Sequence, residues 1–321
     1  MGHVVVLATG GTIASIPREH GDYVASLGGT ELVSRAGEVG TVRAETLFVK
    51  GSYAFTLDDL YEIAQAVGQY LHDPDTDGIV ITQGTDTLEE TSFYLALVLE
   101  RRKPVILTGA QLPASDPHSD GPRNLAQAIT VARDPEAASW GPVVVFNGEI
   151  HAARDVRKVD TAALDAFKSP GWGPVGLVDR GQVIKVRTVR TRRVLPPTVP
   201  RPVGLVRLAV GMTGDDILQA AGGAAGVVLE AFGRGNGHPS VAEAVRQLVE
   251  AGVPVVVTSR CVQGFVAPVY GDGGGRDLER AGAWFAGDLA GEKARLLLGL
   301  LLAHGIRGEE AQAWLAEWAV P

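Results

Sequence analysis

Cysteine is almost absent from this sequence. Cys261 is the single cysteine among 321 residues, which excludes a disulfide within the chain and argues against a zinc site built from several cysteines. We expect Cys261 to be a small buried residue at a strand end and not a nucleophile. So little cysteine suits a reducing compartment, and we expect a cytoplasmic protein.

Excess positive charge is missing as well. The chain has 37 Asp and Glu against 29 Lys and Arg, a net charge of −8, and its pI is about 5.4. This balance argues against nucleic acid or an anionic membrane as a partner. The same charge also serves solubility, so it identifies no particular ligand.

Long hydrophobic runs are the third absence. The longest, LLLGLLLA at residues 296–303, is far too short to span a bilayer and indicates the buried face of a helix. No basic segment followed by a long apolar stretch precedes the strand-like sequence that begins at Val4. We therefore expect neither a membrane span nor a secretion signal.

Short apolar, β-branched runs recur along the chain, most of them ending in glycine. Continuous runs of this length are typical of strands buried on both faces, and helical patterns lie between them. The alternation predicts an α/β fold with mostly parallel sheets flanked by helices. The runs are VVVLATGG (4–11), GIVITQGT (78–85), PVILTGA (104–110), PVVVFNG (142–148), GVVLEAFGRG (226–235) and PVVVTSR (254–260).

Three segments carry signals for the start of a helix. Residues 56–73 place apolar side chains on one face, with Thr56 as the expected N-cap and acidic residues in the first turn. Capping-box spacing, a hydroxyl followed three residues later by Glu, predicts two further helix starts. These are Thr87 with Glu90, before a helix ending near Arg101, and Ser240 with Glu243.

A segment rich in proline and arginine predicts a domain boundary. RTRRVLPPTVPRP, residues 190–202, suits an extended linker and not a packed element. A chain of 321 residues is also longer than one core usually grows. We predict a larger N-terminal domain at 1–190, a linker at 191–202 and a smaller C-terminal domain at 203–321.

Two Gly-Thr turns follow buried strands, TGGT at 9–12 and TQGTD at 82–86. Ligands of parallel sheets bind beyond the carboxyl ends of the strands, so the turns predict a shared cleft. Asp86 alone would more often be a turn or cap residue. Phosphate binding fits poorly, because the sequence contains no G-x-x-x-x-G-K-[ST] and the opening turn lacks G-x-G-x-x-G spacing.

No helix or strand is evident between Thr12 and about Glu31. The intervening SIPREHGDYVASLGG favours a lid or binding loop that carries Tyr23, with Gly21, Gly28 and Gly29 as hinges. A disordered surface loop, with Tyr23 merely packed, is an equally good interpretation of this segment alone.

The two turns lie in longer blocks that resemble a known family. LATGGTIAS (7–15) and ITQGTDTLEET (81–91) are similar to the two signature blocks of bacterial-type L-asparaginases, the threonine amidohydrolases. The resemblance covers nearly the whole chain. It continues through GAQLPASDPHSDGPRNL (109–125), RDVRKVDTAALDAFKSPGWGPVG (154–176), GRGNG (233–237) and EKARLLL (292–298).

The resemblance implies a catalytic set. Thr12 would be the nucleophile and Tyr23 its partner on the lid, while Thr85, Asp86 and Lys158 would form a second polar triad across the substrate. A threonine hydroxyl is a weak nucleophile until a nearby group accepts its proton. A lysine accepts one only when neutral, which burial favours and a carboxylate disfavours. A tyrosine gives up its own proton only at high pH, so either group stays a candidate base.

The resemblance also implies a binding set. Gly51 and Ser52 would hold the substrate's α-carboxylate, Asp86 would pair with its α-ammonium group, and Gly11 would line the site. Asn236 would come from a neighbouring subunit, because the family forms intimate dimers that pair into tetramers. A homodimer or homotetramer is therefore expected, with no metal and no organic cofactor.

The implied reaction is attack on a side-chain amide carbonyl, giving an acyl-enzyme and ammonia, followed by hydrolysis. Backbone N–H groups near Gly11 and Thr85 would stabilise the tetrahedral intermediates. Two departures from the family pattern affect the site. Gln83 stands where His is common, and its amide is expected to keep the hydrogen bonding. Tyr53 stands where many members carry a polar residue that helps to hold the amino group.

The leading hypothesis is an L-asparaginase that takes part in asparagine catabolism, with minor glutaminase activity. A glutamine-preferring amidohydrolase and the asparaginase-like subunit of a transfer-RNA-dependent amidotransferase are alternatives within the enzyme class. A non-catalytic amino-acid-binding homologue and a nucleotide-binding module are alternatives outside it. The joint presence of Thr12, Tyr23, Thr85, Asp86 and Lys158 favours the enzyme.

Overall fold

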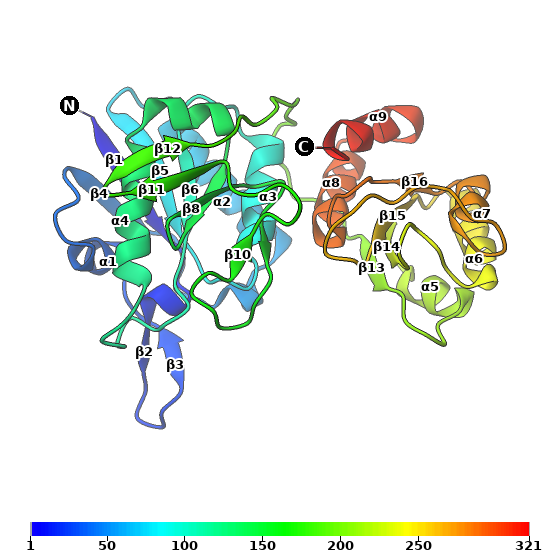
Figure 1. Ribbon diagram of the computed structural model, residues 1–321, viewed down its shortest axis with the longest axis horizontal. Coiled ribbons are helices and arrows are strands. Elements are labelled where there is room, and N and C mark those ends of the chain that lie inside the picture. The colour runs from blue at the N-terminus through cyan, green and yellow to red at the C-terminus, as the bar shows by residue number, and fades with distance from the viewer. Residues whose placement is uncertain (1, 321) are drawn as a thin grey trace. The chain divides into compact units, whose positions relative to one another are not determined.

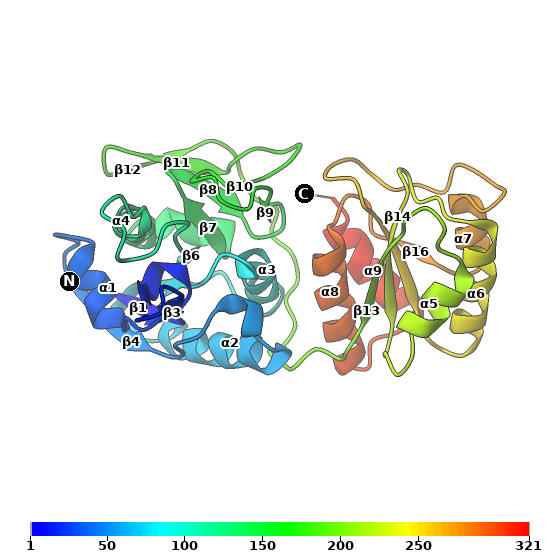
Figure 2. The same ribbon diagram turned by 90° about the horizontal axis from the view of Figure 1, so that it is seen from below.

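The structure is a computed structural model that describes residues 2–320. The chain divides into two compact units, with the boundary between Pro197 and Thr198, and each unit is an α/β layer structure (Figures 1 and 2). This boundary lies within the proline-rich segment 191–202, all of it described and without helix or strand. Part of that segment is packed, however, since Leu195 is buried and donates its N–H to the Leu97 carbonyl.

The N-terminal unit is built on an eight-stranded sheet in the order β12-β11-β8-β7-β6-β5-β1-β4. The five strands from β4 to β7 are parallel, and β8, β11 and β12 are joined by antiparallel pairings. The strands are β1 (His3–Ala8), β4 (Val42–Thr46), β5 (Thr76–Thr82), β6 (Val105–Thr108), β7 (Val143–Phe146), β8 (Glu149–Ala152), β11 (Gly176–Asp179) and β12 (Gln182–Lys185).

Helices cover both faces of this sheet (Figure 2). Val4, Val6 and Ala8 of β1 pack into the core under α1 and α4, while Val5 and Leu7 point to the opposite face, which α2 and α3 cover. Cover on both sides explains why the strand is continuously apolar. The helices are α1 (Gly29–Arg35), α2 (Leu57–Leu71), α3 (Leu88–Val98) and α4 (Gly121–Ala132), with 3₁₀ turns η1 (Thr12–Ala14), η2 (Ser52–Ala54) and η3 (Pro135–Trp140).

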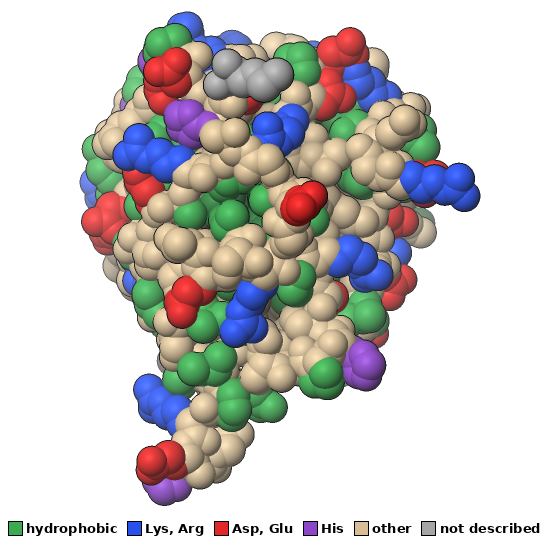
Figure 3. All heavy atoms as spheres, turned by 90° about the vertical axis from the view of Figure 1, so that its left-hand side faces the viewer, with side chains coloured by type: hydrophobic (Ala, Val, Ile, Leu, Met, Phe, Trp, Pro, Cys, Tyr) green, Lys and Arg blue, Asp and Glu red, His purple; other side chains and the backbone are tan. Residues whose placement is uncertain are grey.

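Two short antiparallel hairpins complete this unit. They are β2 (Ser15–Pro17) with β3 (Tyr23–Ala25), and β9 (Arg157–Lys158) with β10 (Phe167–Lys168). The expectation of an irregular loop after Thr12 was therefore wrong in part, because residues 15–25 form the first hairpin. It projects from the body of the unit, with charged and histidine side chains at its end (Figures 1 and 3).

The C-terminal unit has a four-stranded parallel sheet in the order β13-β14-β15-β16. Helices α5 to α7 pack on one face, and α8 and α9 on the other (Figure 2). The strands are β13 (Gly204–Arg207), β14 (Val227–Ala231), β15 (Val255–Ser259) and β16 (Trp284–Phe285). The helices are α5 (Gly214–Ala220), α6 (Pro239–Glu250), α7 (Gly275–Arg280), α8 (Gly291–Ala303) and α9 (Gly308–Trp318).

The six apolar runs correspond to β1, β5, β6, β7, β14 and β15, which confirms the strand predictions. The run at 296–302 is buried within α8, as expected. Over residues 2–320, none of the helices has both the length and the apolar character that a membrane crossing requires.

The helix-cap predictions had mixed outcomes. Thr56 caps α2 through a capping box with Asp59, as expected. The Thr87 hydroxyl makes no cap bond and instead donates to the Ser52 carbonyl at 3.1 Å, and α3 ends at Val98. Helix α6 is capped by His238, because the Ser240 hydroxyl accepts the N–H of Gly214. The two helix starts were confirmed, because Thr87 is the N-cap residue of α3 and α6 begins one residue before Ser240, but neither predicted capping box forms.

Candidate active site

A cavity of about 600 Å³ opens at the carboxyl ends of β1 and β5, the edge where a parallel sheet binds ligands. Its walls come from segments far apart in the sequence. Residues 11–12 follow β1, residues 84–86 follow β5, residues 49–54 follow β4, and residues 23–25 form β3. The two Gly-Thr turns therefore share one cleft, as the sequence predicted, since β1 and β5 are neighbours paired in parallel.

Three loops meet closely in the wall of this cavity, and two glycines make the approach possible. Gly11 has φ +82°, and a Cβ placed there would lie 2.2 Å from the Gly84 nitrogen. A Cβ on Gly84 would in turn lie 2.7 Å from the Ser52 hydroxyl. Only glycine allows the backbones to approach this closely. The contact brings Thr12, Thr85 and Ser52 to one site.

Lys158 joins two of the predicted site residues. Its Nζ donates to Thr85 Oγ1 at 2.8 Å and to Asp86 Oδ1 at 3.0 Å, while its backbone N–H donates to Glu89 at 2.7 Å. Thr85 is buried, whereas the Asp86 side chain is 54% exposed and faces the open part of the site. An exposed carboxylate beside a lysine is suited to bind a cationic group from solvent.

Thr12 and Tyr23 line the same cavity from different elements. Thr12 begins the short turn η1 directly after the glycines, and Tyr23 begins β3 on the projecting hairpin. The Tyr23 side chain is 56% exposed. Within the described part of the chain no hydrogen bond links the two hydroxyls, so the structure places them in one cavity without pairing them.

Ser52 lies in the wall of the cavity, and its hydroxyl is buried. The residue is 1% exposed, and among the residues described its Oγ has no hydrogen-bond partner. Buried hydroxyls are normally satisfied, so an unpartnered one in a cavity wall marks a position for a ligand atom. Gly51 precedes it in the same wall.

The N–H of Gly11 is already in use. It donates to the Lys50 carbonyl at 3.1 Å, so it does not point into the cavity as a free donor. The backbone donors expected near Gly11 and Thr85 would therefore be neighbouring N–H groups of these two loops, not the N–H of Gly11 itself.

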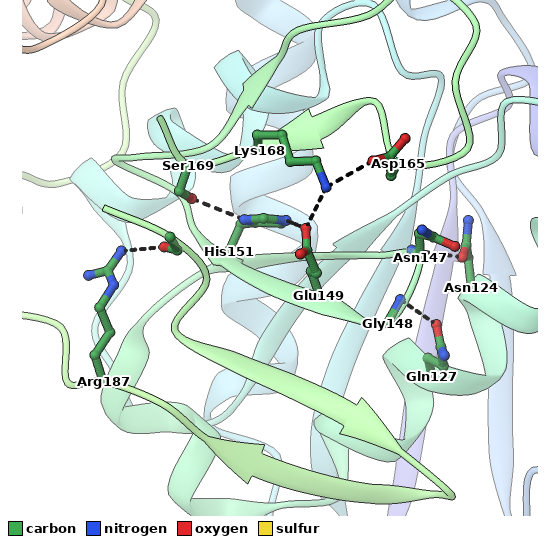
Figure 4. Close-up of polar contacts among 11 residues, drawn as sticks. Asn124, Gln127, Asn147, Gly148, Glu149, His151, Asp165, Lys168, Ser169 and Arg187 are labelled. Carbon is green, nitrogen blue, oxygen red and sulfur yellow. Dashed lines mark hydrogen bonds and ion pairs between the residues drawn. The ribbon is translucent and has the colours of Figure 1, made fainter. Parts of the chain in front are cut away.

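A polar cluster joins β8 to the end of β10, the strand that pairs with β9 and its Lys158 (Figure 4). His151 Nδ1 lies 3.0 Å from Ser169 Oγ, and His151 Nε2 lies 3.3 Å from Glu149 Oε2. Lys168 donates to the same Glu149 oxygen at 3.1 Å. Because β10 pairs with β9, these contacts hold the strand of Lys158 against the main sheet. Sequence reasoning missed this cluster.

The cluster has a clear electrostatic effect on its carboxylate. The contact with His151 lowers the pKa of Glu149 most strongly; partial burial acts in the opposite direction, and Lys168 lowers the pKa further, to about 2. Glu149 is therefore a carboxylate across the whole neutral range, and its charge is matched by the Lys168 ammonium.

The comparisons with known proteins identify both units. The family model described as "Asparaginase, N-terminal" matches residues 3–191, and "Glutaminase/Asparaginase C-terminal domain" matches residues 202–315. The chain belongs to the asparaginase family.

Named relatives cover nearly the full length. The L-asparaginase of Bacillus licheniformis is 34% identical over 306 residues, spanning 94% of this chain and 95% of the relative. A probable L-asparaginase of Deinococcus radiodurans is 38% identical over 314 residues, spanning 96% and 95%. The glutaminase-asparaginase of Pseudomonas aeruginosa is 31% identical over 332 residues, spanning 97% and 89%.

The two departures from the asparaginase pattern have structural counterparts. Gln83 is fully buried, and its Nε2 donates to the hydroxyls of Thr87 and Thr91 at 3.2 and 2.9 Å. Tyr53 is 81% exposed, and its ring lies against Gly51, where a Cβ would come within 2.3 Å of the ring. Tyr53 thus forms an aromatic rim of the cavity next to Ser52.

Two other residues lie outside this cavity. Asn236 belongs to the C-terminal unit, where its Oδ1 accepts the N–H of Gly275 at 3.3 Å. Cys261 is exposed, two residues beyond the end of β15. The expectation of a buried Cys261 was wrong, because the chain leaves the sheet at Ser259 and turns to the surface.

Sequence reasoning also missed Gln111 in the cavity wall. Its backbone N–H is held by the carboxylate of Asp120 at 3.1 Å, and its Nε2 is buried without a partner among the described residues. Gln111 lies inside the asparaginase-like block 109–125, but only the fold shows which member of that block faces the site. The described residues contain no group of three or more His, Cys, Asp or Glu arranged to hold a metal ion.

Proposed function

We propose that the protein hydrolyses the side-chain amide of L-asparagine to L-aspartate and ammonia through an acyl-enzyme on Thr12, with minor glutaminase activity. One observation carries the proposal. A single cavity at the ends of β1 and β5 is lined by Thr12, by Thr85 and Asp86, which both accept hydrogen bonds from Lys158, and by Ser52, whose buried hydroxyl has no partner among the described residues. Full-length relatives named L-asparaginase or glutaminase-asparaginase support it.

In the proposed binding mode, the α-carboxylate and the α-ammonium group of the substrate are held by different residues of the cavity. The Ser52 hydroxyl, which has no partner among the described residues and lies beside Gly51, receives the α-carboxylate. The exposed carboxylate of Asp86 pairs with the α-ammonium group. With both groups held, the side-chain amide reaches toward Thr12, and this fixed geometry lowers the entropic cost of attack.

The proposed reaction has two steps. Thr12 Oγ attacks the amide carbonyl, the C–N bond breaks, and ammonia leaves after taking up the threonine proton. Water then attacks the ester, and Thr12 regains a proton as aspartate is released. Lys158, which bonds Thr85 and Asp86, accepts a proton only in its neutral form, and Tyr23 is the other candidate for that role.

Ammonia release from asparagine and from glutamine tests the proposal directly. We expect the Thr12→Val variant to lose activity by about 10³-fold or more, since a nucleophile has been removed, while Thr12→Ser retains part of it. A wild-type protein that releases no ammonia from either amide would overturn the enzyme in favour of a non-catalytic amino-acid-binding homologue. Faster turnover of glutamine would favour a glutamine-preferring amidohydrolase, which the name of the Pseudomonas relative supports.

We further propose a cytoplasmic homodimer or homotetramer. The single cysteine supports the location, since the fold needs no oxidising compartment, although one Haemophilus influenzae relative is named a probable periplasmic L-asparaginase. Cell fractionation that places the protein outside the cytoplasm would contradict the location.

A further inference from the structure

The segment that carries Gly51 and Ser52 is tied to the loop of Thr12 through one residue, Lys50. The Gly11 N–H donates to the Lys50 carbonyl at 3.1 Å. Gly10 lies so close that a Cβ there would be 2.5 Å from that same oxygen. The backbone before the threonine therefore rests on the backbone before the serine.

The side chain of Lys50 is anchored in turn. Its Nζ donates to Asp59 Oδ1 at 2.7 Å, and the Asp59 side chain is only 10% exposed. The ammonium also lies 5.0 Å from the ring centre of Phe48 and 5.4 Å from that of Phe55. A charge held between a buried carboxylate and two aromatic faces is more firmly placed than a solvated surface lysine.

Asp59 connects this anchor to a rigid element. Its Oδ2 accepts the N–H and the hydroxyl of Thr56, at 2.6 and 2.9 Å, which forms the cap of α2. Burial alone would raise the pKa of Asp59, but the bonds from Lys50 and Thr56 outweigh burial and leave the pKa below its ordinary value. The start of α2 thus holds Lys50, and Lys50 holds both loops.

We propose that Lys50 and Asp59 are positioning residues that fix the separation between Thr12 and Ser52 and so select the length of the substrate. This inference rests on the proposed function. Asparagine and glutamine differ by one methylene between the α-carbon and the amide. If Ser52 holds the carboxylate, only one of the two places its carbonyl correctly at Thr12. One methylene in a shaped site changes kcat/KM by roughly 10- to 200-fold.

The test compares kcat and KM for both amides in the wild type, Lys50→Met, Asp59→Asn and Lys50→Arg. We expect the first two variants to lose kcat for asparagine while glutamine turnover holds or rises, so that the asparagine-to-glutamine ratio of kcat/KM falls by about tenfold or more. Lys50→Arg keeps the ion pair and should keep the ratio. Asp59→Asn keeps an acceptor for Thr56, so it preserves the helix cap if Lys50→Met folds poorly.

A matched control separates positioning from simple stability. Arg102→Met removes an exposed ion pair with Glu100 and should leave the ratio unchanged. If Lys50→Met and Asp59→Asn lower the melting temperature but keep the wild-type ratio, Lys50 and Asp59 only stabilise α2 and the inference fails, although the proposed function stands. If the wild type hydrolyses neither amide, both fail together.

Discussion

At the scale of single residues, Lys158 is the side chain whose role depends most on its surroundings. In the sequence RDVRK it looks like a surface lysine, yet its Nζ bonds Thr85 and Asp86. Both bonds are short and one partner is charged, so the ammonium is fixed within the site. An ammonium in this position stabilises negative charge and supplies or relays a proton.

Replacing Lys158 by methionine should lower kcat for asparagine by roughly 10² to 10⁴-fold, the usual contribution of a positioned proton-transfer group. Lys158→Arg should not restore the rate, because guanidinium stays protonated and has a different shape. The measurement is steady-state ammonia release across pH. Arg157→Met, on the same strand, serves as a control, and an unchanged rate in Lys158→Met would remove the Lys158 group from the mechanism.

The sequence predicts individual site residues well where a motif carries them and poorly where only packing does. Thr12, Thr85 and Asp86 lie in motif blocks and line one cavity, and Lys158, from a third block, bonds Thr85 and Asp86. The role proposed for Lys50 depends on the Asp59 carboxylate, nine residues away, and on the rings of Phe48 and Phe55. No local sequence pattern predicts these contacts. The burial of a hydroxyl without a partner, as in Ser52, is likewise a property of the folded chain alone.

At the scale of elements, Lys158 lies on β9, which pairs with β10, and the cluster of Glu149, His151, Lys168 and Ser169 secures that pair to β8 (Figure 4). The negative charge of Glu149 contributes to the stability of the folded protein through this cluster. Its folded pKa of about 2 lies below the ordinary value of 4.5, so the folded state favours the carboxylate.

The Glu149→Gln variant should therefore be less stable than the wild type above pH 4.5, and the difference should shrink as pH falls from 4.5 toward 2. The sign follows from protonation: below the unfolded pKa, the unfolded chain binds a proton that the folded chain still excludes. Melting temperatures of both proteins across this range provide the check. Glu62→Gln, at an exposed position, serves as the control and should show no such trend. A difference in melting temperature between Glu149→Gln and the wild type that stays constant at every pH would contradict the lowered pKa of Glu149.

The elements themselves show which sequence signals are reliable. Strands such as β1 were predictable because cover on both faces demands an unbroken apolar run. The β2–β3 hairpin was not, since each strand has three residues and no periodicity. The Thr87 cap failed because a carbonyl 35 residues away competes for its hydroxyl. Local sequence patterns therefore predict helix caps and strands unless a residue distant in the sequence forms a competing hydrogen bond.

At the scale of the whole molecule, the expected assembly can be tested through Asn236. We predict that the protein sediments at two or four times its chain mass of 33.6 kDa. If Asn236 contributes to a neighbour's site, the Asn236→Ala and Thr12→Val variants should each be weakly active alone. Co-expression of the two should restore activity, because a mixed dimer combines an intact Thr12 from one chain with an intact Asn236 from the other in one of its two sites. A fully active 33.6 kDa species would contradict the assembly, and failure to regain activity would show that Asn236 is not shared.

The contact of Gly11 with Gly84 has a consequence for how this protein can change. A methyl group at either position would clash with backbone atoms or with a buried hydroxyl, so almost no substitution is tolerated there. At Gly21, in the turn of the projecting hairpin, an added Cβ would meet nothing within 4 Å, and only the strained φ of +85° limits the choice. We therefore expect new substrate ranges to arise from changes in the hairpin and in the Tyr53 rim, with glycine kept at positions 11 and 84.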